Sequence, residues 1–386
     1  MKIPLTYNVR NLRVRKITTL MTALGAALTV AVLVSVLALV QGLRTSFQVT
    51  GNPHHLLVMR KAATSELVSV ITRENFQDIL SQQDIARDKD GKPLASLEMI
   101  TVVNLELPGG KDMNVNLRGI TPMGWEMRDQ VHLVAGRTFQ SGKREIVVGR
   151  SIAEKSPAAH LGGRLEFGRG IWDVVGIMDG GRSTFNSEIF CDLNQVSSDY
   201  QRHDYLSSAL VEAKPRRMDA LARNIEDDRR LNVLVKPEQQ YYADQMGNAK
   251  PVQFMGTFVA IIMAVGSAFA AMNTMYAAVA RRSAEIGTLR VLGFSRSSVL
   301  VSFLLESVLI SLIGGLVGCL LTLPLNNIET GMGSFTTWSQ LSFNFHVTPQ
   351  IMAWGVLFAS IIGALGGFLP ARNAADKQII AALKAR

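Results

Sequence analysis

The stretch RRSAEIGTLRVLGFSRSSVL, residues 281–300, is the charged segment from which the organisation of this chain can be worked out. It follows a charge-free stretch, 252–280, and precedes another long apolar stretch. A membrane-spanning helix needs about 20 largely apolar residues. We therefore expect residues 281–300 to form a short loop between two membrane spans, in which arginines, a glutamate and glycines are concentrated.

Four stretches of the 386-residue chain are apolar and long enough to cross a membrane: 17–43, 252–280, 299–323 and 351–371. We expect the third span to begin near Val299, which places Glu306 inside it. The first stretch is longer than the apolar core of a secretory signal, and no small-x-small cleavage site follows it, so we expect it to be retained. The predicted fold class is a helical membrane protein with four transmembrane helices and a large α+β extracytoplasmic domain between spans one and two.

Lysines and arginines are concentrated on one side of these spans. The amphipathic segment 1–16, the loop 281–298 and the tail 372–386 are all net basic, whereas 324–350 contains no lysine or arginine. The stretch 44–251 carries equal numbers of basic and acidic residues. By the positive-inside rule, the termini and the loop 281–298 are cytoplasmic, and 44–251 and the short loop 324–350 lie outside. The net charge of +9 thus reflects membrane topology, and nucleic-acid binding is not expected.

The outer stretch has the pattern of a mixed α and β domain. Strand patterns occupy 54–60, 94–107, 111–120, 206–213 and 231–237, and helix patterns occupy 71–83 and 217–230. The PGG between the second and third strand patterns is a hairpin signal. We interpret the glycine-rich segment 121–204 as a mostly β subdomain inserted into this domain; one continuous α+β domain is the alternative. Cys191 and Cys319 fall in different compartments, so no disulfide is expected.

The sequence contains no pattern that indicates catalysis. GRTFQSGKR, residues 136–144, resembles a phosphate-binding loop, but five residues separate its glycines where four are required, and Arg144 replaces the serine or threonine that would hold magnesium. His54 and His55 are adjacent, and the other histidines lack metal-ligand spacing. We therefore expect no metal site, no directly bound cofactor and no enzymatic activity in this polypeptide. A proton- or sodium-driven transporter is disfavoured because Glu306 is the single ionisable residue within the spans.

RRSAEIGTLRVLGFSRSSVLVSFLLESVLISLIGGLVG, residues 281–318, resembles the signature of FtsX/MacB-type ABC permeases. It contains the charged pair, the E-I-G, the L-R, the G-x-S and the later glutamate before a glycine-rich helix. Further segments resemble the family's first span (8–43), its periplasmic core domain (136–155 and 161–178) and its closing P-A-R-x-A segment (369–386). Asn373 and the absence of a later proline depart from the closing segment. The resemblance covers nearly the whole chain.

This resemblance implies a stand-alone permease subunit of the bacterial inner membrane, with an extracytoplasmic domain of the Porter/Sabre type. It implies a homodimer, or a pair with a paralogue, driven by two copies of a cytoplasmic ATPase that binds ATP and Mg. Because 16 residues precede the first span, the ATPase is expected to be a separate chain. The permease would couple ATP hydrolysis to movement of its periplasmic domain, a mechanism called mechanotransmission, in order to export or extract a substrate.

Several points remain open at this stage. A periplasmic adaptor and an outer-membrane duct are compatible with the resemblance. The main alternative is an FtsX-like regulator that transmits ATPase motion to a cell-wall hydrolase. A membrane-tethered binding module without an ATPase is a further alternative.

Residues 284–292 are expected to form a short helix along the cytoplasmic face, and the resemblance makes this the coupling helix that seats in the ATPase. Ile286 and Leu289 lie on one side of it and form an apolar ridge that suits a groove on another protein. Gly293 suits a helix stop. The full set of predicted coupling residues is Arg282, Glu285, Ile286, Gly287, Leu289, Arg290 and Gly293. The alternative is an amphipathic turn that rests on lipid headgroups.

Two expectations concern the interior of the spans. Glu306 lies at a depth similar to that of Asn273 and Thr274, so we expect a hydrogen bond between spans three and two; the alternative is a glutamate that reaches the headgroups. Two small-xxx-small pairs are expected to pack spans three and four against each other, with ordinary glycine enrichment as the alternative. These pairs are Gly314 with Gly318 and Gly363 with Gly367.

Overall fold

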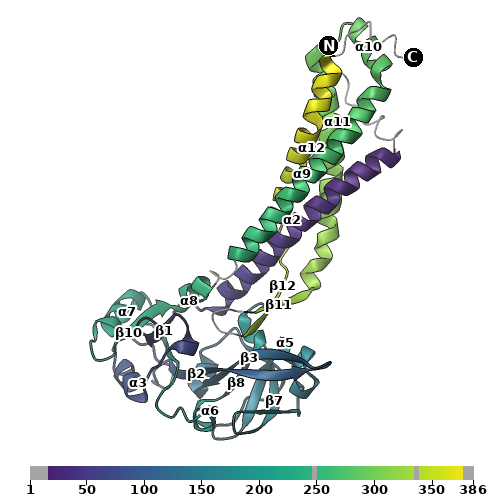
Figure 1. The fold of residues 1–386 in the computed structure, drawn as a ribbon. Helices are drawn as coiled ribbons and strands as arrows, with labels where there is room; N and C mark the ends of the chain where they lie inside the picture. Colours follow the sequence, from purple (N-terminus) through teal and green to yellow (C-terminus); the bar gives the residue numbers. More distant parts are fainter. Residues whose placement is uncertain (1–15, 246–249, 334–338, 377–386) are drawn as a thin grey trace. The chain divides into compact units, whose positions relative to one another are not determined.

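The computed structural model describes residues 16–245, 250–333 and 339–376 (Figure 1). It divides into two compact units. The helical unit comprises residues 16–42, 250–328 and 345–376, and the α/β unit comprises residues 43–245, 329–333 and 339–344. Of the predicted N-terminal segment 1–16, only Lys16 is among the described residues. The predicted tail 372–386 is described up to Asp376.

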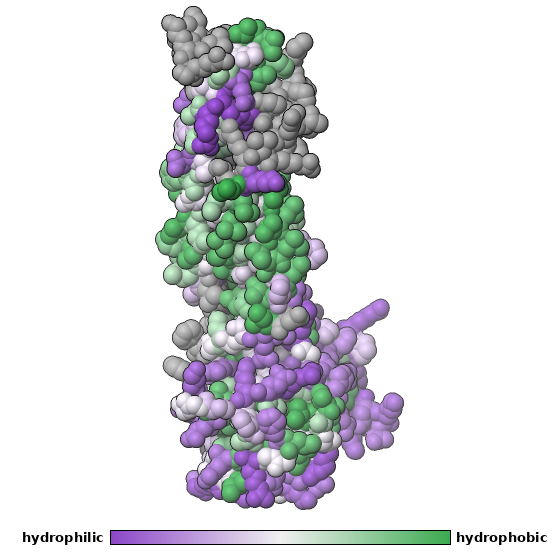
Figure 2. Space-filling view, turned by 90° about the vertical axis from the view of Figure 1, so that its right-hand side faces the viewer, coloured by the Kyte–Doolittle hydropathy of each residue, from purple (hydrophilic) through white to green (hydrophobic). Residues whose placement is uncertain are grey.

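The helical unit contains four long helices and one short one. They are α2 (Lys16–Thr50, in this unit up to Gly42), α9 (Lys250–Arg281), α10 (Ser283–Val291), α11 (Arg296–Thr322) and α12 (Pro349–Asp376). A short 3-10 turn, η5 (Leu323–Asn327), follows α11. All the long helices are long and apolar enough to cross a membrane, which confirms the prediction of four such helices. On the face drawn in Figure 2, apolar side chains gather on the helical unit and polar ones on the α/β unit.

The glycine pairs of α11 and α12 pack in a way that the sequence predicted only in part. Gly363 and Gly367 of α12 lie against Ser311 and Ser307 of α11, and the Ser307 hydroxyl donates to the carbonyl of Gly363 at 2.8 Å. Spans three and four therefore do meet at these glycines. The other pair, however, faces a different helix.

Gly314 and Gly318 lie against the backbone carbonyls of Ala23 and Ala27, both on α2. The prediction that this pair faces span four was wrong, because α11 presents different glycines to its two neighbours. Gly315, one residue along, is the glycine that approaches α12, at Ala359. Small residues allow backbones to approach closely on any face of a helix, so α11 packs tightly on two sides.

The α/β unit is built on one mixed sheet, in the order β10-β1-β9-β2-β3-β8-β5-β7-β4, with β6 paired to β7. Its strands are β1 (His55–Arg60), β2 (Ala95–Leu107), β3 (Lys111–Ile120), β4 (His132–Gly136), β5 (Glu145–Gly149), β6 (Arg164–Phe167), β7 (Gly170–Asp179), β8 (Glu188–Asp192), β9 (Ser208–Glu212) and β10 (Val233–Pro237). The predicted strands and the PGG hairpin of β2 and β3 are present.

Short helices connect these strands. They are α3 (Arg73–Leu80), α4 (Pro122–Glu126), α5 (Arg150–Lys155), α6 (Leu193–Asp199), α7 (Met218–Asp227) and α8 (Glu238–Gln245), with 3-10 turns η1 (Glu66–Val68), η2 (Pro157–Ala159) and η3 (Thr184–Ser187). The predicted helix start at Thr72 is a capping box, in which Thr72 accepts from the backbone of Asn75 and the Asn75 side chain accepts in return.

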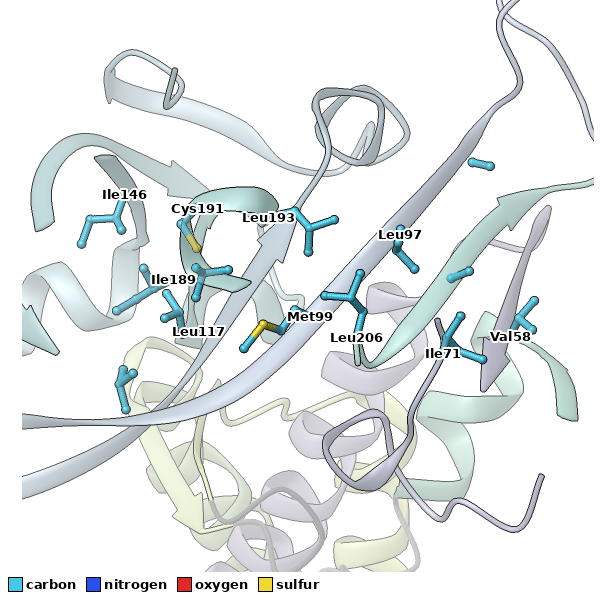
Figure 3. Packing of buried hydrophobic residues seen from close by; sticks show 14 of the residues in the cluster. Val58, Ile71, Leu97, Met99, Leu117, Ile146, Ile189, Cys191, Leu193 and Leu206 are labelled. Atoms are coloured by element: carbon cyan, nitrogen blue, oxygen red, sulfur yellow. The ribbon is translucent and has the colours of Figure 1, made fainter. Parts of the chain in front are cut away.

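Segment 121–204 does not form a sheet of its own. Its strands, β4 to β8, continue the same sheet through a parallel pairing of β8 with β3. These strands stand together at one end of that sheet, beyond β3, and the division into an inserted subdomain or one continuous domain stays a prediction. One cluster of buried apolar residues crosses the join, from Val58 and Ile71 on one side to Ile146 and Ile189 on the other (Figure 3).

The predicted outer loop 324–350 contains a second, two-stranded sheet, β11 (Glu329–Gly333) with β12 (Gln340–Asn344), which belongs to the α/β unit. The backbone N–H of Ser342 donates to Ser187 at 2.7 Å, and Lys155 pairs with Glu329 at 2.8 Å. The polar, glycine-containing sequence of this loop did not indicate that it packs on the domain between spans one and two.

Candidate functional site

The short helix predicted over residues 284–292 is present as α10, and its sequence explains where it ends. The chain leaves the helix through Gly293, whose φ of +92° is a backbone conformation that glycine adopts without strain. The N–H of Gly293 donates to Arg290 at 3.2 Å, and the N–H of Phe294 donates to Leu289 at 3.1 Å. These two bonds form a Schellman motif, which satisfies carbonyl groups at the helix end.

The two sides of α10 have different surroundings from those that the sequence suggested. Ile286 has 1% of its surface exposed, and it packs with Met275, Val279, Val299 and Phe303 in the core of the helical unit. Gly287 is buried too, and Leu289 and Arg290 are half-buried. The prediction that Ile286 forms the docking ridge was wrong, because this side chain already packs against α9 and α11 of the same chain.

A different face of α10 is exposed, and we call it the docking face: Ala284, Glu285, Thr288, Val291 and Leu292. Its positions follow the i, i+4, i+7 and i+8 spacing of one helix side. Val291 and Leu292 have 62% and 65% of their surfaces exposed. The two exposed aliphatic side chains thus lie at the end of this face, and Glu285 supplies a negative charge near its beginning.

Arg282, immediately before α10, is the residue that ties the helix to α11. Its guanidinium donates to Glu306 at 2.8 Å, and it also lies 3.2 Å from the carboxylate of Glu285. The guanidinium stands over the ring of Phe303, 4.9 Å from its centroid. The side chains of Arg282 and Glu306 are 3% and 6% exposed, whereas that of Glu285 is 59% exposed.

The partner of Glu306 therefore differs from the one predicted. Asn273 is exposed, and the Thr274 hydroxyl accepts from Thr22 at 3.2 Å and donates to the carbonyl of Ala271. Position along the helix axis had suggested span two, but Arg282 extends from the end of that span to the glutamate. A buried carboxylate next to a buried guanidinium is a paired group, so the alternative of a glutamate that reaches the headgroups does not apply.

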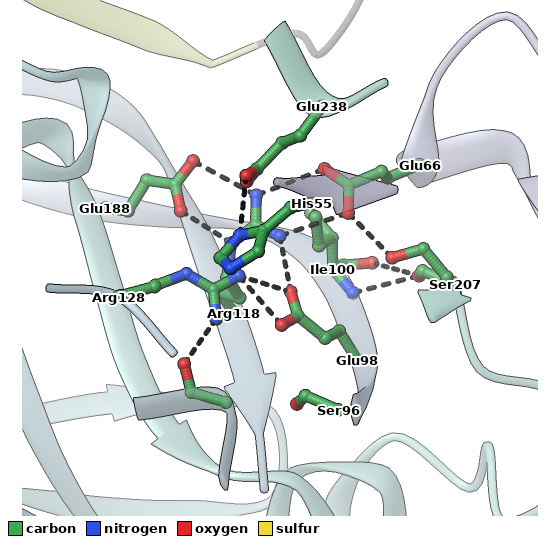
Figure 4. Close-up of polar contacts among 12 residues, drawn as sticks. His55, Glu66, Ser96, Glu98, Ile100, Arg118, Arg128, Glu188, Ser207 and Glu238 are labelled. Atoms are coloured by element: carbon green, nitrogen blue, oxygen red, sulfur yellow. Dashed lines mark hydrogen bonds and ion pairs between the residues drawn. The ribbon is translucent and has the colours of Figure 1, made fainter. Parts of the chain in front are cut away.

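A second polar site lies inside the α/β unit, and the sequence did not reveal it (Figure 4). Arg118 contacts the carboxylates of Glu66, Glu98 and Glu188 at 2.8–3.1 Å. Arg128 holds both oxygens of Glu98, at 2.7 and 2.8 Å. The one available signal was that Glu98 and Arg118 stand beside aliphatic residues, in LEMI (97–100) and LRGI (117–120).

Burial and charge act against each other on the pKa values in this cluster. Burial raises the pKa of Glu66, and the opposing charge of Arg118 does not compensate fully. Burial alone would also raise the pKa of Glu98, but Arg128 and Arg118 together outweigh it and lower that pKa. Glu98 is therefore held in its charged form more firmly than Glu66, because it is shared by two guanidinium groups.

Residues that resembled a phosphate loop have structural partners instead. Arg137 holds Glu145 at 2.6 Å, and Arg144 holds Asp199 at 2.8 Å. His55 is buried and lies 3.0 Å from Glu238. Across residues 16–245, 250–333 and 339–376, no group of three or more histidine, cysteine, aspartate or glutamate side chains is arranged to hold a metal ion.

Two family models match the chain. The MacB-like periplasmic core domain matches residues 19–228, and the FtsX-like permease C-terminal region matches residues 257–379. An uncharacterized ABC transporter permease, YknZ of Bacillus subtilis (strain 168), is 25% identical over 96% of this chain and 95% of that protein.

The macrolide export ATP-binding/permease protein MacB of Pasteurella multocida (strain Pm70) is 24% identical over 95% of this chain, which spans 58% of the length of that protein. Among solved structures, the periplasmic region of MacB from Actinobacillus actinomycetemcomitans aligns with 50% of this chain and 92% of that chain, with 13% identity and a TM-score of 0.38.

Proposed function

Because the chain belongs to the family of ABC transporter permeases with a MacB-like periplasmic core domain, we propose that it couples a separate ABC ATPase in the cytoplasm to movement of its α/β unit outside the membrane. The observation that carries the proposal is the docking face of α10, which ends in the exposed Val291 and Leu292. The ATPase supplies ATP binding and hydrolysis with Mg, and this chain supplies the contact and the moving parts.

The path of the motion follows from what each helix contacts. Force on the docking face passes through Arg282 and Glu306 into α11. From α11 it passes to α2 and α12, which lie against the α11 glycines and serines. One unbroken helix, α2, runs over Lys16–Thr50, and its residues from Leu43 onward belong to the α/β unit.

The α/β unit is the part that acts on the cargo in this proposal, in the inner membrane of a bacterium and with a second permease copy or a paralogue as partner. Export or extraction of a substrate is favoured over regulation of a cell-wall hydrolase, because the MacB-like core domain accounts for more than half of the chain. The relative named for macrolide export is consistent with this direction.

The experiment that tests the docking face compares two exposed positions on the same side of the membrane. Leu292→Asp places a charge at the apolar end of the docking face, and Ser297→Asp places the same charge on the first turn of α11, outside the docking face. An unpaired buried charge costs several kcal/mol, and about 1.4 kcal/mol is a factor of ten in affinity. We expect Leu292→Asp to weaken ATPase binding more than tenfold and Ser297→Asp to leave it within about twofold.

The measurement is copurification of the full chain with its ATPase from native membranes, followed by titration of the ATPase onto the purified permease. Recovery of an ABC ATPase with the unmodified chain excludes the tethered binding module. If Leu292→Asp recruits and stimulates the ATPase as the unmodified chain does, the docking face has been assigned wrongly. If no ATPase is recovered with the unmodified chain, the proposed function itself fails.

A further inference from the structure

The sheet of the α/β unit consists of two halves that are joined by one strand pair. The first half is β10, β1, β9, β2 and β3, and the second half is β8, β5, β7, β4 and β6. Among the described residues, the sheet order joins these halves only through β3 and β8, which pair over Asn116–Ile120 and Glu188–Asp192. This pairing is parallel, and parallel pairs are slightly less stable per residue than antiparallel ones. We call it the seam.

Two buried arginines reach across the seam. Arg118 belongs to β3, in the first half, and its Nε donates to Glu188 of β8 at 2.8 Å. Arg128 follows α4, which packs on β2 and β3, and its guanidinium holds Glu98 of β2 at 2.7 and 2.8 Å. All four side chains are at most 3% exposed. Arg118 therefore joins the halves through an ion pair, and Arg128 joins them through the rings of Phe185 and of Phe190 on β8.

The arginines have further contacts that fix their orientation. Arg128 donates to the carbonyl of Gly124 at 2.6 Å and stands over the rings of Phe185 and Phe190, at 5.4 and 5.6 Å from their centroids. Arg118 also contacts Glu66 of η1, at 3.1 Å. Arg118 is bidentate to Glu66, and Arg128 is stacked on two rings. Either arrangement leaves a planar guanidinium few alternative orientations, so the geometry is specific as well as favourable.

The same cluster lies next to the segments that connect the α/β unit to the rest of the chain. The backbone N–H of Glu66 donates to the hydroxyl of Tyr241 on α8 at 3.1 Å. A small cavity of about 30 Å³ is lined by Arg118, Glu66 and Glu188 together with Tyr241 of α8 and Phe47 of α2. The last turns of α2 and the helix before α9 therefore border the cluster directly.

Burial of so many charges is weak evidence for a contribution to stability. Replacing a buried ion pair by well-packed apolar side chains is often neutral or stabilising. Apolar contacts have no preferred direction, so they would allow the two halves to slide along the seam. A bidentate arginine–carboxylate pair has a fixed geometry and does not allow this sliding. The cluster also leaves no room for a metal ion, because the Arg118 guanidinium occupies the position between the carboxylates.

We propose that Arg118 and Arg128 are positioning residues that clasp the two halves of the sheet, so that displacement of α8 and the end of α2 moves the α/β unit as one body. The clasp itself depends only on the contacts at the seam. Its part in transmitting force rests on the proposed function.

The test measures the distance between the halves in the full chain, in lipid nanodiscs and without the ATPase. Spin labels are attached at Arg223→Cys on α7, in the first half, and at Arg169→Cys in the turn between β6 and β7, in the second half; both positions are exposed. The native Cys191 and Cys319 are buried and do not compete for the label. With the clasp intact, we expect a single narrow distance distribution from double electron–electron resonance.

Three variants separate a clasp from simple charge balance. Arg128→Met removes the guanidinium and is expected to broaden the distribution or add a second population. Arg128→Met combined with Glu98→Leu removes both charges, so it is expected to restore thermal stability without restoring the narrow distribution. Arg128→Lys keeps the charge but loses the planar guanidinium that stands over Phe185 and Phe190, and it replaces Arg128→Met in the test if that variant does not fold. The matched control is Arg164→Met, which breaks an exposed pair with Asp173 and is expected to leave the distribution unchanged.

The outcomes decide the clasp independently of the proposed function. A narrow distribution in the double variant or in Arg128→Lys overturns the clasp, because charge balance or general packing then suffices. A separate measurement adds the ATPase and ATP to the spin-labelled chain in which Arg118 and Arg128 are unchanged, and it tests the proposed function. If the permease fails to bind an ATPase while the variants broaden the distribution, the clasp stands and the proposed function fails.

Discussion

Glu306→Ala removes the carboxylate that pairs with the buried Arg282 guanidinium, and it gives the sharpest test of the contact between α10 and α11. Arg282 is 3% exposed, and its guanidinium lies 2.8 Å from Glu306. Breaking a buried ion pair from one side costs about 3–5 kcal/mol, because the remaining charge is left uncompensated. We therefore expect Glu306→Ala to lower the free energy of unfolding of the helical unit by about this amount, reduced by the contact that Arg282 keeps with the exposed Glu285.

Glu306→Gln is expected to cause a smaller loss of stability than Glu306→Ala. Glutamine keeps the shape and one hydrogen-bond acceptor, and a neutral hydrogen bond is worth roughly half of a charge-assisted one. We expect a loss of about 1–2 kcal/mol. The ATPase activity stimulated by the permease should fall in the same order, with Glu306→Ala affected more than Glu306→Gln, because a loose α10 transmits less motion to α11.

A double-mutant cycle with Arg282→Met measures the pair itself. Equilibrium unfolding of the purified chain in detergent gives the four free energies, and we expect a coupling above about 1 kcal/mol. The double variant should be more stable than Glu306→Ala alone, since it leaves no unpaired charge. A coupling near zero, together with equal and unmodified stability of both Glu306 variants, would refute the assignment of this pair as the joint between α10 and α11.

Three further predictions concern packing and pH. Ile286→Asp should lower the melting temperature of the permease in the absence of any ATPase, as measured by thermal unfolding, whereas an interface residue would have no such effect. Gly318→Leu should destabilise the helical unit by about 1–3 kcal/mol through overpacking against α2, whereas Gly266→Leu, with open space around it, should leave the melting temperature unchanged. The paired arginines lower the pKa of Glu98. The contribution of its carboxylate to stability is therefore complete above the ordinary carboxyl pKa, and it is lost as the pH falls through the lowered pKa. When stability is measured against pH, the difference between the unmodified chain and Glu98→Gln should disappear at low pH.

The apolar spans and α10 could be predicted from sequence because each depends on local information. Charge-free stretches of sufficient length have few folds available to them, and the turn at Gly293 follows from the conformational freedom of one glycine. Which face of α10 is exposed could not be predicted in the same way. Ile286 and Leu292 are both aliphatic, and the choice between core and surface was made by residues of α9 and α11 that pack on one side only.

The glycine pairs show a related limit. A small-xxx-small pair indicates that some backbone comes close, but it does not identify that backbone. Gly318 and Gly367 carry the same local signal, and they face α2 and α11 respectively. Partner identity is set by how the helices are arranged around α11, which no single helix sequence contains.

The buried cluster falls between these cases, because part of it follows from the hairpin. Glu98 lies in a stretch of β2 that is buried on both faces, where a charge must be paired. The PGG turn sets the register, in which Ile100 lies opposite Arg118. Glu98 is therefore the diagonal neighbour of Arg118 on the same face, within reach of a long side chain. Glu188 could not be found in this way. It lies 70 positions from Arg118 along the chain, and the parallel pairing of β8 with β3 brings the two side chains together. A charge in a doubly buried strand thus predicts that a partner exists, and local register identifies that partner only when it lies in the same hairpin.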